Sequence, residues 1–453
     1  MSGYTCNNWT SAADPAESAY GVAGNVSNYK EKWSYWDHRA RCDNSYRIYC
    51  FQSNESAPCP PECMVCTGDP DSGIICSCDP DCGATPTDIP TPTPTTPAGP
   101  EGWYHSDWSY RKSLTVDAGK VAGSGSHGSF PILVKRTDGN WKTTGNGGHV
   151  SQSDGGDIVF TAGDGTTKLD HEIEKYSASS GELVAWVKIP SLSTGTDTQI
   201  YVYYGNASLA GGSNQWNPTG VWSDGYQAAY HLHNDEADST DNHDGTNSGS
   251  DNAGGRVADG QDFEANDSSD KIGLGTWSVS GNKLTLQAWV KFESFATDDA
   301  RLISKAKEQD ANDHVFMLST ISSGGQKRLR ARIKTGTSDG SGTATAIATS
   351  GDLATGQWYL ASVVYDGSKI KLYLNGNQVG SESKSGNLRQ NNWEIQLGNN
   401  PYSDPSHKKP LDGILDEVRI SSKDRSSDWL KTEFNNQNDP NGFFKAVGGE
   451  ERK

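Results

Sequence analysis

A stretch rich in proline and threonine, residues 84–102, divides the chain into two chemically different parts. It reads ATPTDIPTPTPTTPAGPEG, which offers almost no apolar side chain to bury. Because the prolines remove backbone N–H donors and fix an extended backbone, this stretch predicts a polyproline-like spacer. All nine cysteines lie before it, between Cys6 and Cys82. We therefore expect a small disulfide-rich head, a spacer and a large cysteine-free body.

The overall composition narrows the classes of partner. With 39 Lys and Arg against 57 Asp and Glu, the formal net charge is −18, which argues against nucleic acid and anionic membranes as partners. No apolar run reaches the roughly 18 residues that a transmembrane helix needs. Only 33% of the residues are hydrophobic, yet the chain has 14 Trp and 18 Tyr. That combination is typical of turn-rich β-modules and not of disordered chains.

The cysteines and the start of the chain point in different directions. Dense cysteines are typical of oxidising, extracellular compartments, so we expect a secreted or cell-surface protein. The sequence nevertheless begins Met-Ser-Gly-Tyr-Thr-Cys, without the basic and apolar stretches of a signal peptide. We therefore expect the natural N-terminus to lie upstream of residue 1.

Residues 1–52 combine three cysteines with clustered aromatic residues. The informative strings are Cys6-Asn-Asn-Trp-Thr10, Trp33-Ser-Tyr-Trp36 and Tyr46-Arg-Ile-Tyr-Cys50-Phe51. This segment resembles the C-terminal half of a C-type-lectin-like domain of the kind related to endostatin. The resemblance implies a Cys6–Cys42 disulfide and leaves Cys50 without its partner. The odd number of cysteines agrees with one unpaired thiol.

Residues 53–83 form a second cysteine cluster in a segment rich in Pro, Asp and Gly. Its members are Cys59, Cys63, Cys66, Cys76, Cys78 and Cys82. They can form three disulfides, whose connectivity the spacing leaves open. The Cys63-x-x-Cys66 pair also fits half of a zinc site, but no histidine follows at finger spacing. We favour disulfides, given the extracellular interpretation.

Residues 103–225 alternate apolar and polar side chains. Clear examples are Lys112, Leu114 and Val116, then Phe130, Ile132 and Val134. Short alternating runs between Gly, Asp and Ser turns predict an all-β sandwich. The segment also resembles domain of unknown function 2341, found in bacterial and archaeal surface proteins. The matching strings include Phe130-Pro-Ile-Leu-Val134, His171-Glu-Ile-Glu174, Ala185-Trp-Val-Lys-Ile-Pro190 and Tyr201-Val-Tyr-Tyr-Gly-Asn206.

One acidic pair in this half has the residue types for chemistry. In a strand, Glu172 and Glu174 project from the same face, where two carboxylates can serve a glycosidase or, with His171, hold a cation. The alternative is an outer strand face in water, with Ile173 turned inward. We favour the alternative and expect both glutamates to be solvated, with ordinary pKa values.

Residues 226–453 carry longer alternating strands and strong turn signals. Leu284, Leu286, Ala288, Val290 and Phe292 fall on one face, and Asp366-Gly367 and Asn375-Gly376 predict hairpin turns. These features predict a jelly roll of two packed sheets, so the fold class is all-β with two sandwiches.

The same segment resembles a laminin-G-like, concanavalin-A-like domain. The resemblance rests on strings such as Tyr230-His-Leu232, Leu286-Gln-Ala-Trp-Val290, Lys371-Leu-Tyr-Leu-Asn-Gly376 and Leu411-Asp-Gly-Ile-Leu-Asp-Glu-Val-Arg-Ile420. It implies binding of glycans or proteins, often with calcium. Hydrolases of the superfamily carry a Glu-x-Asp-x-x-Glu strand or a close variant, and no such string occurs here, so we expect no catalytic residues.

Oxygen-bearing side chains gather in residues 235–245. Asp238, Asp241, Asn242 and Asp244 supply the hard ligands that calcium prefers, and the resemblance adds Asp416 as a distant ligand. The alternative is a polar turn held by Asx-type hydrogen bonds. Calcium is thus the cofactor that this sequence suggests.

These observations predict a secreted or surface multi-module protein that binds glycan or protein ligands and helps cells adhere. Two other functions stay open. One is a structural surface or filament component, and the other is a carbohydrate-active enzyme that uses Glu172 and Glu174. The sequence identifies neither the ligand-binding residues nor the oligomeric state.

Overall fold

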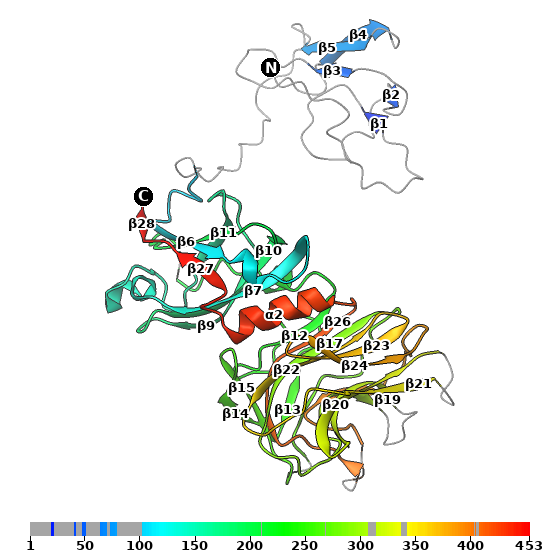
Figure 1. Ribbon diagram of the computed structural model, residues 1–453. Coiled ribbons are helices and arrows are strands. Elements are labelled where there is room, and N and C mark those ends of the chain that lie inside the picture. Colours follow the sequence, from blue (N-terminus) through cyan, green and yellow to red (C-terminus); the bar gives the residue numbers. More distant parts are fainter. Residues whose placement is uncertain are drawn as a thin grey trace. The chain divides into compact units, whose positions relative to one another are not determined.

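The computed structural model describes residues 102–209, 211–267, 269–306, 314–336, 342–402, 404 and 407–453, with the backbone of short strands before residue 79 (Figure 1). The chain divides into two compact units, Met1–Thr95 and Thr96–Lys453. Among the described helices, none has both the length and the apolar character that crossing a bilayer requires.

The N-terminal unit contains short paired strands. Strand β1 (Tyr20–Gly21) pairs antiparallel with β2 (Ala40–Arg41). Strand β5 (Gly73–Cys78) pairs with β3 (Ile48–Cys50) in parallel and with β4 (Met64–Asp69) antiparallel. One small sheet therefore joins residues on both sides of the expected boundary at residue 52. The Cys6–Cys42 bridge lies outside the described residues and stays a prediction.

The larger unit begins with a β-sandwich. Its strands are β6 (Tyr110–Val116), β7 (Ser126–Thr137), β8 (Val159–Ala162), β9 (His171–Ser177), β10 (Glu182–Ser193), β11 (Thr198–Tyr204), β27 (Phe444–Val447) and β28 (Glu451–Arg452). One sheet has the order β27-β6-β11-β8, with β28 also on β6, and the other has the order β7-β10-β9. Apolar side chains of both sheets, among them Val116, Ile132 and Ala185, form one buried cluster.

The residues predicted to face inward in this sandwich are buried, but Leu133 on the other face of β7 and Trp186 on the other face of β10 are buried as well. Leu114 and Val116 of β6 are buried, as are Ile132 and Val134 of β7. Lys112 shares the inward face of β6, and its ammonium group lies 2.5 Å from a carboxylate oxygen of Asp138. This ion pair explains how a charged residue fits an inward position, because a buried charge needs a partner.

The C-terminal segment returns to the first sandwich. Residues 444–447 and 451–452 pair with β6, and Phe444 joins the first core. The end of the expected 226–453 segment, from Phe444 onward, therefore belongs to a sheet of the first sandwich. The physical reason is that β6 would otherwise be an unpaired sheet edge, which the returning strands cover.

The second sandwich consists of two large antiparallel sheets. Its strands are β12 (Tyr226–Tyr230), β13 (Thr246–Ser248), β14 (Asp251–Gly254), β15 (Asp259–Phe263), β16 (Lys271–Gly273), β17 (Leu284–Phe292), β18 (Arg301–Ala306), β19 (His314–Ser323), β20 (Gln326–Lys334), β21 (Thr343–Ile347), β22 (Trp358–Tyr365), β23 (Lys369–Leu374), β24 (Asn377–Ser383), β25 (Glu394–Leu397) and β26 (Gly413–Ser421). One sheet has the order β14-β15-β26-β17-β22-β23-β24, with β12 on β26. The facing sheet has the order β13-β16-β25-β18-β19-β20-β21. The predicted all-β jelly roll is confirmed.

The turn signals of this sandwich behave as predicted. Tyr365 pairs with Ile370 across the first hairpin, and β23 continues directly into β24. Asn375 and Gly376 both have positive φ, 54° and 74°. Two successive positive φ angles match the right-handed twist of a tight hairpin, which is why an Asn-Gly pair fits there.

Strand β17 differs from its prediction, because both of its faces are buried. The five predicted apolar residues point into the sandwich core. On the other face, Gln287 and Trp289 donate side-chain hydrogen bonds to residues of α2 (Ser427–Asn438), at 2.7 and 2.6 Å. The sequence pattern predicts which residues of β17 face the core, but it does not predict that α2 covers the opposite, polar face.

Helix α2 lies between the two sandwiches (Figure 1). Its N-cap is Ser426, whose hydroxyl accepts a hydrogen bond from the backbone N–H of Trp429 at 3.1 Å. Trp429 and Leu430 join the first core, while Glu433 and Gln437 bond to β17. The remaining helical segments are short: α1 (Pro218–Val221), η5 (Ala118–Lys120), η6 (Gly139–Trp141) and η7 (Thr144–Asn146).

Candidate functional site

The acidic pair of β9 lies between the sandwiches. The side chain of Glu174 is 1% exposed and that of Glu172 is 12% exposed. The prediction that both face water is wrong, because Ile173 enters the first core while the glutamates meet residues of the second sandwich. His171 shares the inward face, where its ring nitrogens lie 3.1 and 3.0 Å from main-chain carbonyl oxygens. His171 is therefore a structural residue of the first core.

His231, which follows β12, lies at the centre of this buried group. Its Nδ1 atom is 2.8 Å from Glu417 Oε1 and 3.6 Å from Glu174 Oε2. Its Nε2 atom is 3.2 Å from Glu172 Oε2. The imidazole ring stacks on Trp186 with a centroid distance of 5.8 Å and an interplanar angle of 17°. Carboxylates from both sandwiches therefore meet on one histidine.

A bulge in β26 brings further charges to the same place. The register between β17 and β26 shifts between Gln287 and Trp289, and Glu417 has a φ of 51°. A bulge adds a residue to one strand and redirects its side chains, and it is often found next to functional sites. Arg419 Nη2 lies 2.7 Å from Glu417, and its Nη1 lies 3.2 Å from Glu433 of α2.

We call this group the interdomain cluster. Its members are Glu172, Glu174, His231, Asp416, Glu417, Arg419 and Glu433. The indoles of Trp186 and Trp222 cover it, with the Arg419 guanidinium 4.3 and 4.6 Å from their ring centroids. The cluster is therefore screened from water by large apolar rings.

Burial and neighbouring charge divide the carboxyls of the cluster into two kinds. Burial, reinforced by the Glu417 charge, raises the pKa of Glu174 well above its usual range. Burial likewise raises the pKa of Asp416 to about 8. Burial opposes a charged His231, but the Glu417 and Glu172 carboxylates outweigh it and raise its pKa well above the ordinary value. Neutral acids therefore lie beside an imidazolium and its carboxylate partners.

Two carboxyl oxygens of the cluster have no hydrogen-bond partner among the described residues. They are Glu174 Oε1 and Asp416 Oδ1, both buried. The second oxygen of each group is bonded, since Glu174 Oε2 accepts from the Trp186 indole and Asp416 Oδ2 accepts from the backbone N–H of Val257. A buried oxygen without a partner is costly, so each requires an explanation.

The structure joins residues that the sequence placed in separate sites. The sequence places Glu172 and Glu174 on an acidic strand face of the first sandwich, and Asp416 in the calcium set. His231, Glu417 and Arg419 were not singled out as functional, although they lie in two strings that carry the laminin-G-like resemblance. Only the tertiary structure brings them together, because His231 contacts the glutamates of β9 and Arg419 contacts Glu417 and Glu433 of α2.

The predicted calcium loop is held by hydrogen bonds within the chain. Asp238 Oδ1 accepts from the backbone N–H groups of Ala229 and Thr240, at 2.8 and 3.0 Å. Its Oδ2 accepts from the Thr240 hydroxyl at 2.6 Å and from the His243 backbone N–H at 3.1 Å. Asp244 caps the backbone N–H of Asp238 at 2.9 Å. These hydrogen bonds are the contacts expected from the alternative to a calcium site, a polar turn held by Asx-type hydrogen bonds.

The other members of the calcium set are dispersed. Asp241 and Asn242 are exposed, and Asn242 donates to the Thr240 carbonyl oxygen at 2.9 Å. Asp416 belongs to the interdomain cluster. Among the described residues, convergent groups of ligand types are instead Glu174 with His231 and Glu417, and Asp262 with Glu264 and Glu293. Calcium at the predicted set stays a prediction.

A hollow of about 470 Å³ lies at the start of the first sandwich. We call it the aromatic hollow. It is lined by Tyr104, His105, Asp107, Trp108, Asn206, Ser208, Leu209 and Gln215. The rings of Tyr104 and Trp108 meet edge to face, 5.1 Å apart, and Tyr104 is partly exposed. Aromatic faces and polar side chains thus line one concave surface.

Local hydrogen bonds fix the walls of the aromatic hollow. The Trp108 indole donates to the Asp157 carbonyl oxygen at 2.7 Å, and the Asp157 carboxylate accepts from the Asn206 backbone N–H at 3.1 Å. His105 Nδ1 accepts from the Asp107 backbone N–H at 3.2 Å. In the neutral ring, Nε2 then carries the proton. This buried donor has no partner among the described residues.

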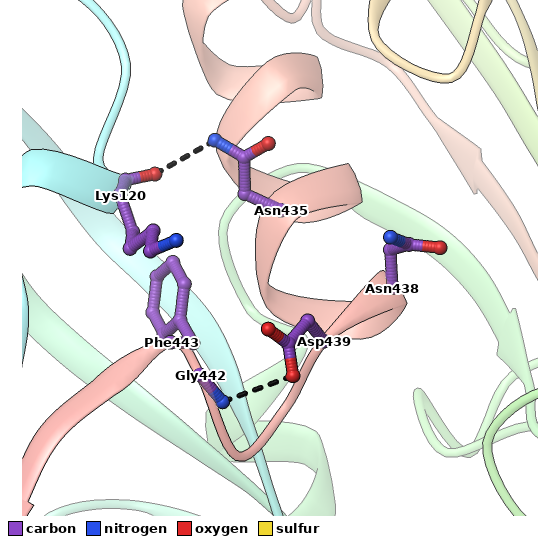
Figure 2. A pocket seen from close by; sticks show the side chains of 6 residues that line it. All are labelled: Lys120, Asn435, Asn438, Asp439, Gly442 and Phe443. Carbon is purple, nitrogen blue, oxygen red and sulfur yellow. Dashed lines mark hydrogen bonds between the residues drawn. The ribbon is translucent and has the colours of Figure 1, made fainter.

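A second hollow, of about 350 Å³, lies at the C-terminal end of α2 (Figure 2). Its lining is Lys120, Asn435, Asn438, Asp439, Gly442 and Phe443. Asn435 donates to the Lys120 carbonyl oxygen at 2.8 Å, and Asp439 accepts from the Gly442 backbone N–H at 3.0 Å. Because these contacts tie α2 to the first sandwich, this hollow is a polar junction within the fold.

Comparison with known families identifies the two sandwiches. Residues 266–431 match the family described as the concanavalin A-like lectin/glucanases superfamily. The second sandwich is a concanavalin A-like domain. Residues 154–246 match a domain of unknown function, DUF2341. Both resemblances in the body are confirmed, while neither match reaches residues 1–52, where the C-type-lectin-like module stays a prediction.

Several solved structures resemble part of the chain at low identity. Domain 4 of AbnA, an extracellular GH43 arabinanase from Geobacillus stearothermophilus solved with arabinotriose, is 23% identical, with 46% of this chain and 96% of that chain covered and a TM-score of 0.36. The serotype D botulinum neurotoxin ligand-binding domain with N-acetylneuraminic acid is 14% identical, with 49% and 53% covered and a TM-score of 0.37. A heptameric SAP-like pentraxin from Limulus polyphemus is 15% identical, with 36% and 73% covered and a TM-score of 0.28. No curated protein matches the chain.

Proposed function

We propose that this chain is an extracellular, non-catalytic binding protein that recognises saccharides and takes part in adhesion at a cell surface. The observation that carries the proposal is the aromatic hollow. Sugars present apolar C–H faces that stack on aromatic rings, and hydroxyl groups that bond to amides and carboxylates. Binding sites for small ligands combine apolar walls with a few placed polar groups in this way.

The groups in the hollow suit a sugar ring. Tyr104 offers a partly exposed ring, and the side chains of Asn206, Gln215 and Asp107 offer amide and carboxylate groups. His105 adds a buried N–H donor without a partner among the described residues. A ligand hydroxyl would satisfy that donor, whose isolation otherwise costs about 1–3 kcal/mol.

The surface of the described residues favours a polar ligand. Among them, Ile347, at 39%, is the one large apolar side chain that is more than partly exposed. Protein docking and self-assembly commonly use broad apolar patches. The concanavalin A-like domain supports the same class of ligand, since that superfamily includes lectins.

The interdomain position of the acidic pair supports a non-catalytic role. A glycosidase needs two carboxyl groups on either side of the scissile bond of a bound sugar. Glu172 and Glu174 instead contact His231 and the indoles of Trp222 and Trp186. These contacts leave the side chains of Glu174 and Glu172 only 1% and 12% exposed, which supports a role without substrate contact.

A glycan array probed with the labelled full chain tests the proposal. Binding to at least one saccharide class is expected, and Tyr104→Ala should weaken it about tenfold, because ring stacking contributes roughly 1–1.5 kcal/mol. The double variant with Tyr104→Ala and Gln215→Ala should bind the saccharide more weakly than Tyr104→Ala alone. Tyr402→Ala is the matched control, since this partly exposed tyrosine lies in a loop of the other sandwich.

Each alternative function has its own outcome in the same samples. Saccharide binding that Tyr104→Ala leaves intact would place the site elsewhere and remove the hollow as its basis. Concentration-dependent assembly without saccharide binding would favour a structural filament component. Release of reducing ends from a polysaccharide panel would instead show an enzyme.

A further inference from the structure

We propose that Glu174, His231 and Glu417 bind one divalent first-row transition-metal ion at the junction of the two sandwiches. Glu174 comes from β9 of the first sandwich, whereas His231 and Glu417 come from the second. Each residue offers one ligand atom, and these atoms lie within 4.8 Å of one another. Ligands that share an ion, each about 2.0–2.2 Å from it, must converge in this manner.

The orientation of each proposed ligand is fixed by a neighbouring group. Arg419 Nη2 donates to Glu417 Oε2 at 2.7 Å, which leaves Oε1 facing His231 Nδ1. The Trp186 indole donates to Glu174 Oε2 at 2.9 Å. Metal sites require such outer partners, because they hold the ligands in the geometry that the ion needs.

Glu172 completes the arrangement around the histidine. Its Oε2 lies 3.2 Å from His231 Nε2, so it can accept a hydrogen bond from an Nε2–H group. In that tautomer the Nδ1 lone pair is free to bind an ion. Glu172 is itself held by the Trp222 indole at 2.6 Å and by the Ser239 hydroxyl at 2.6 Å. A carboxylate behind the far nitrogen of a metal-bound imidazole fixes its tautomer and raises its basicity.

An independent observation points to a cation rather than to a closed hydrogen-bond network. Glu174 Oε1 is buried and has no hydrogen-bond partner among the described residues, and the same is true of Asp416 Oδ1. A buried carboxyl oxygen without a partner has lost its hydration, and a positive ion beside it compensates that loss.

The ligand types select the class of ion. Calcium prefers six to eight oxygen ligands, whereas imidazole with carboxylates suits zinc and its first-row neighbours. Because the ligands come from both sandwiches, the bound ion would also link them.

The experiment measures metal content after refolding. The full chain is unfolded in a chelator, refolded with Zn²⁺ or without metal, desalted and analysed by elemental mass spectrometry. Wild type should hold one more zinc ion per chain than Glu174→Gln. That variant preserves the shape of a neutral acid, and near-UV circular dichroism checks its fold. The difference between the two proteins also cancels any zinc held by the cysteine-rich head.

Two further variants refine the test. Glu172→Gln should retain the ion but weaken its affinity about 10–100-fold, as loss of an outer partner does. Glu264→Gln is the matched control, because Glu264 lies in the other convergent acidic group, with Asp262 and Glu293. It should hold as much zinc as wild type. Cobalt bound at the site should show ligand-field bands without a thiolate charge-transfer band in the wild-type minus Glu174→Gln difference spectrum.

The outcomes separate the proposal from its alternatives. Equal zinc content in wild type and Glu174→Gln would overturn it, as would a loss of zinc in Glu264→Gln alone. Calcium that binds this site in preference to zinc would contradict the choice of ion class. If Glu174→Gln does not fold, the graded affinity of Glu172→Gln and the wild-type stoichiometry still decide the question. The test is independent of saccharide binding.

Discussion

Two acid-rich regions of this chain, the 235–245 loop and the interdomain cluster, use their carboxylates in opposite ways. In the loop, both oxygens of Asp238 accept hydrogen bonds from nearby backbone and hydroxyl groups. In the cluster, Glu174 and Glu417 face a histidine and each other, and only part of their bonding capacity is used. The loop is dense in acids along the sequence, while the cluster is dense only in space.

This difference shows what makes a carboxylate available. A turn presents its own backbone N–H groups, which compete with any external ligand for the same lone pairs. Strands spend their N–H groups on the sheet ladder, so carboxylates on the sheet face must find side chains, protons or ions. The number of acids in a segment is therefore a weaker indicator than the type of backbone that carries them.

The largest expected effect comes from removing the main fixed cation of the cluster. Arg419→Met leaves Glu417 and Glu433 without their guanidinium partner in a site where all three side chains are at most 3% exposed. The free energy of unfolding should fall by about 3–5 kcal/mol, as for other broken buried ion pairs. Urea denaturation followed by tryptophan fluorescence measures it.

The matched control is Lys283→Met, which breaks a surface pair with Asp424 between side chains that are 49% and 33% exposed. Its effect should stay within about 0–1 kcal/mol. Equal losses in the two variants would show that burial does not distinguish the cluster, and the comparison would fail.

The next effect tests the loop. Asp238→Ala removes the acceptor of four hydrogen bonds and leaves buried N–H groups without a partner. The free energy of unfolding should fall by about 2–3 kcal/mol in Asp238→Ala. It should fall less in Asp238→Asn, because asparagine keeps one acceptor oxygen.

Thermal melting curves of the wild type and of Asp238→Ala, recorded with calcium and with a chelator, test the calcium hypothesis. Hydrogen bonds alone predict equal losses for Asp238→Ala in calcium and in a chelator. The calcium hypothesis adds a stabilisation of the wild type by calcium that Asp238→Ala abolishes. A melting temperature of wild type that does not respond to millimolar calcium would remove that hypothesis.

The smallest effect concerns a third, half-exposed acidic group. Burial, with the charges of Glu293 and Glu264, raises the pKa of Asp262 from 3.8 to about 6. The folded state therefore keeps a proton that the unfolded state releases, and stability from this group falls as the pH rises from about 4 to about 6. Asp262→Asn should flatten that part of the pH profile and stabilise the protein above pH 6. An unchanged pH profile would show that solvent screens this carboxyl fully.

Local features of the fold were predictable from sequence. The alternation in Leu284–Phe292, the Asn375-Gly376 turn and the strands around Ile132 all depend on neighbours within a few residues. The helix at 427–438 was missed, although Ser426 is a good N-cap, because its polar face points to the polar side of β17 instead of to water. Amphipathic patterns presuppose a solvent side, which this helix lacks.

The sites were predictable only in part. The residue types of Glu172, Glu174 and Asp416 drew attention in the sequence, but the solvated position predicted for the two glutamates was wrong. Nothing near His231 or Glu417 in the sequence marks them as site residues. Both lie close to β9 in space, although His231 is about 60 residues and Glu417 about 245 residues from Glu172 in the sequence. The aromatic hollow likewise joins residues 104–108 to residues 206–215.

By itself, the sequence determined the all-β class and the two sandwiches, because periodicity, turn chemistry and composition act over short distances along the chain. The tertiary structure alone decided which sheet faces meet water. Helix α2 packs against both sandwiches, the returning strand β27 covers the edge of β6, and the bulge at Glu417 turns its carboxylate toward β9. Burial changes the protonation and the partners of a carboxyl, and burial is a property of the whole fold.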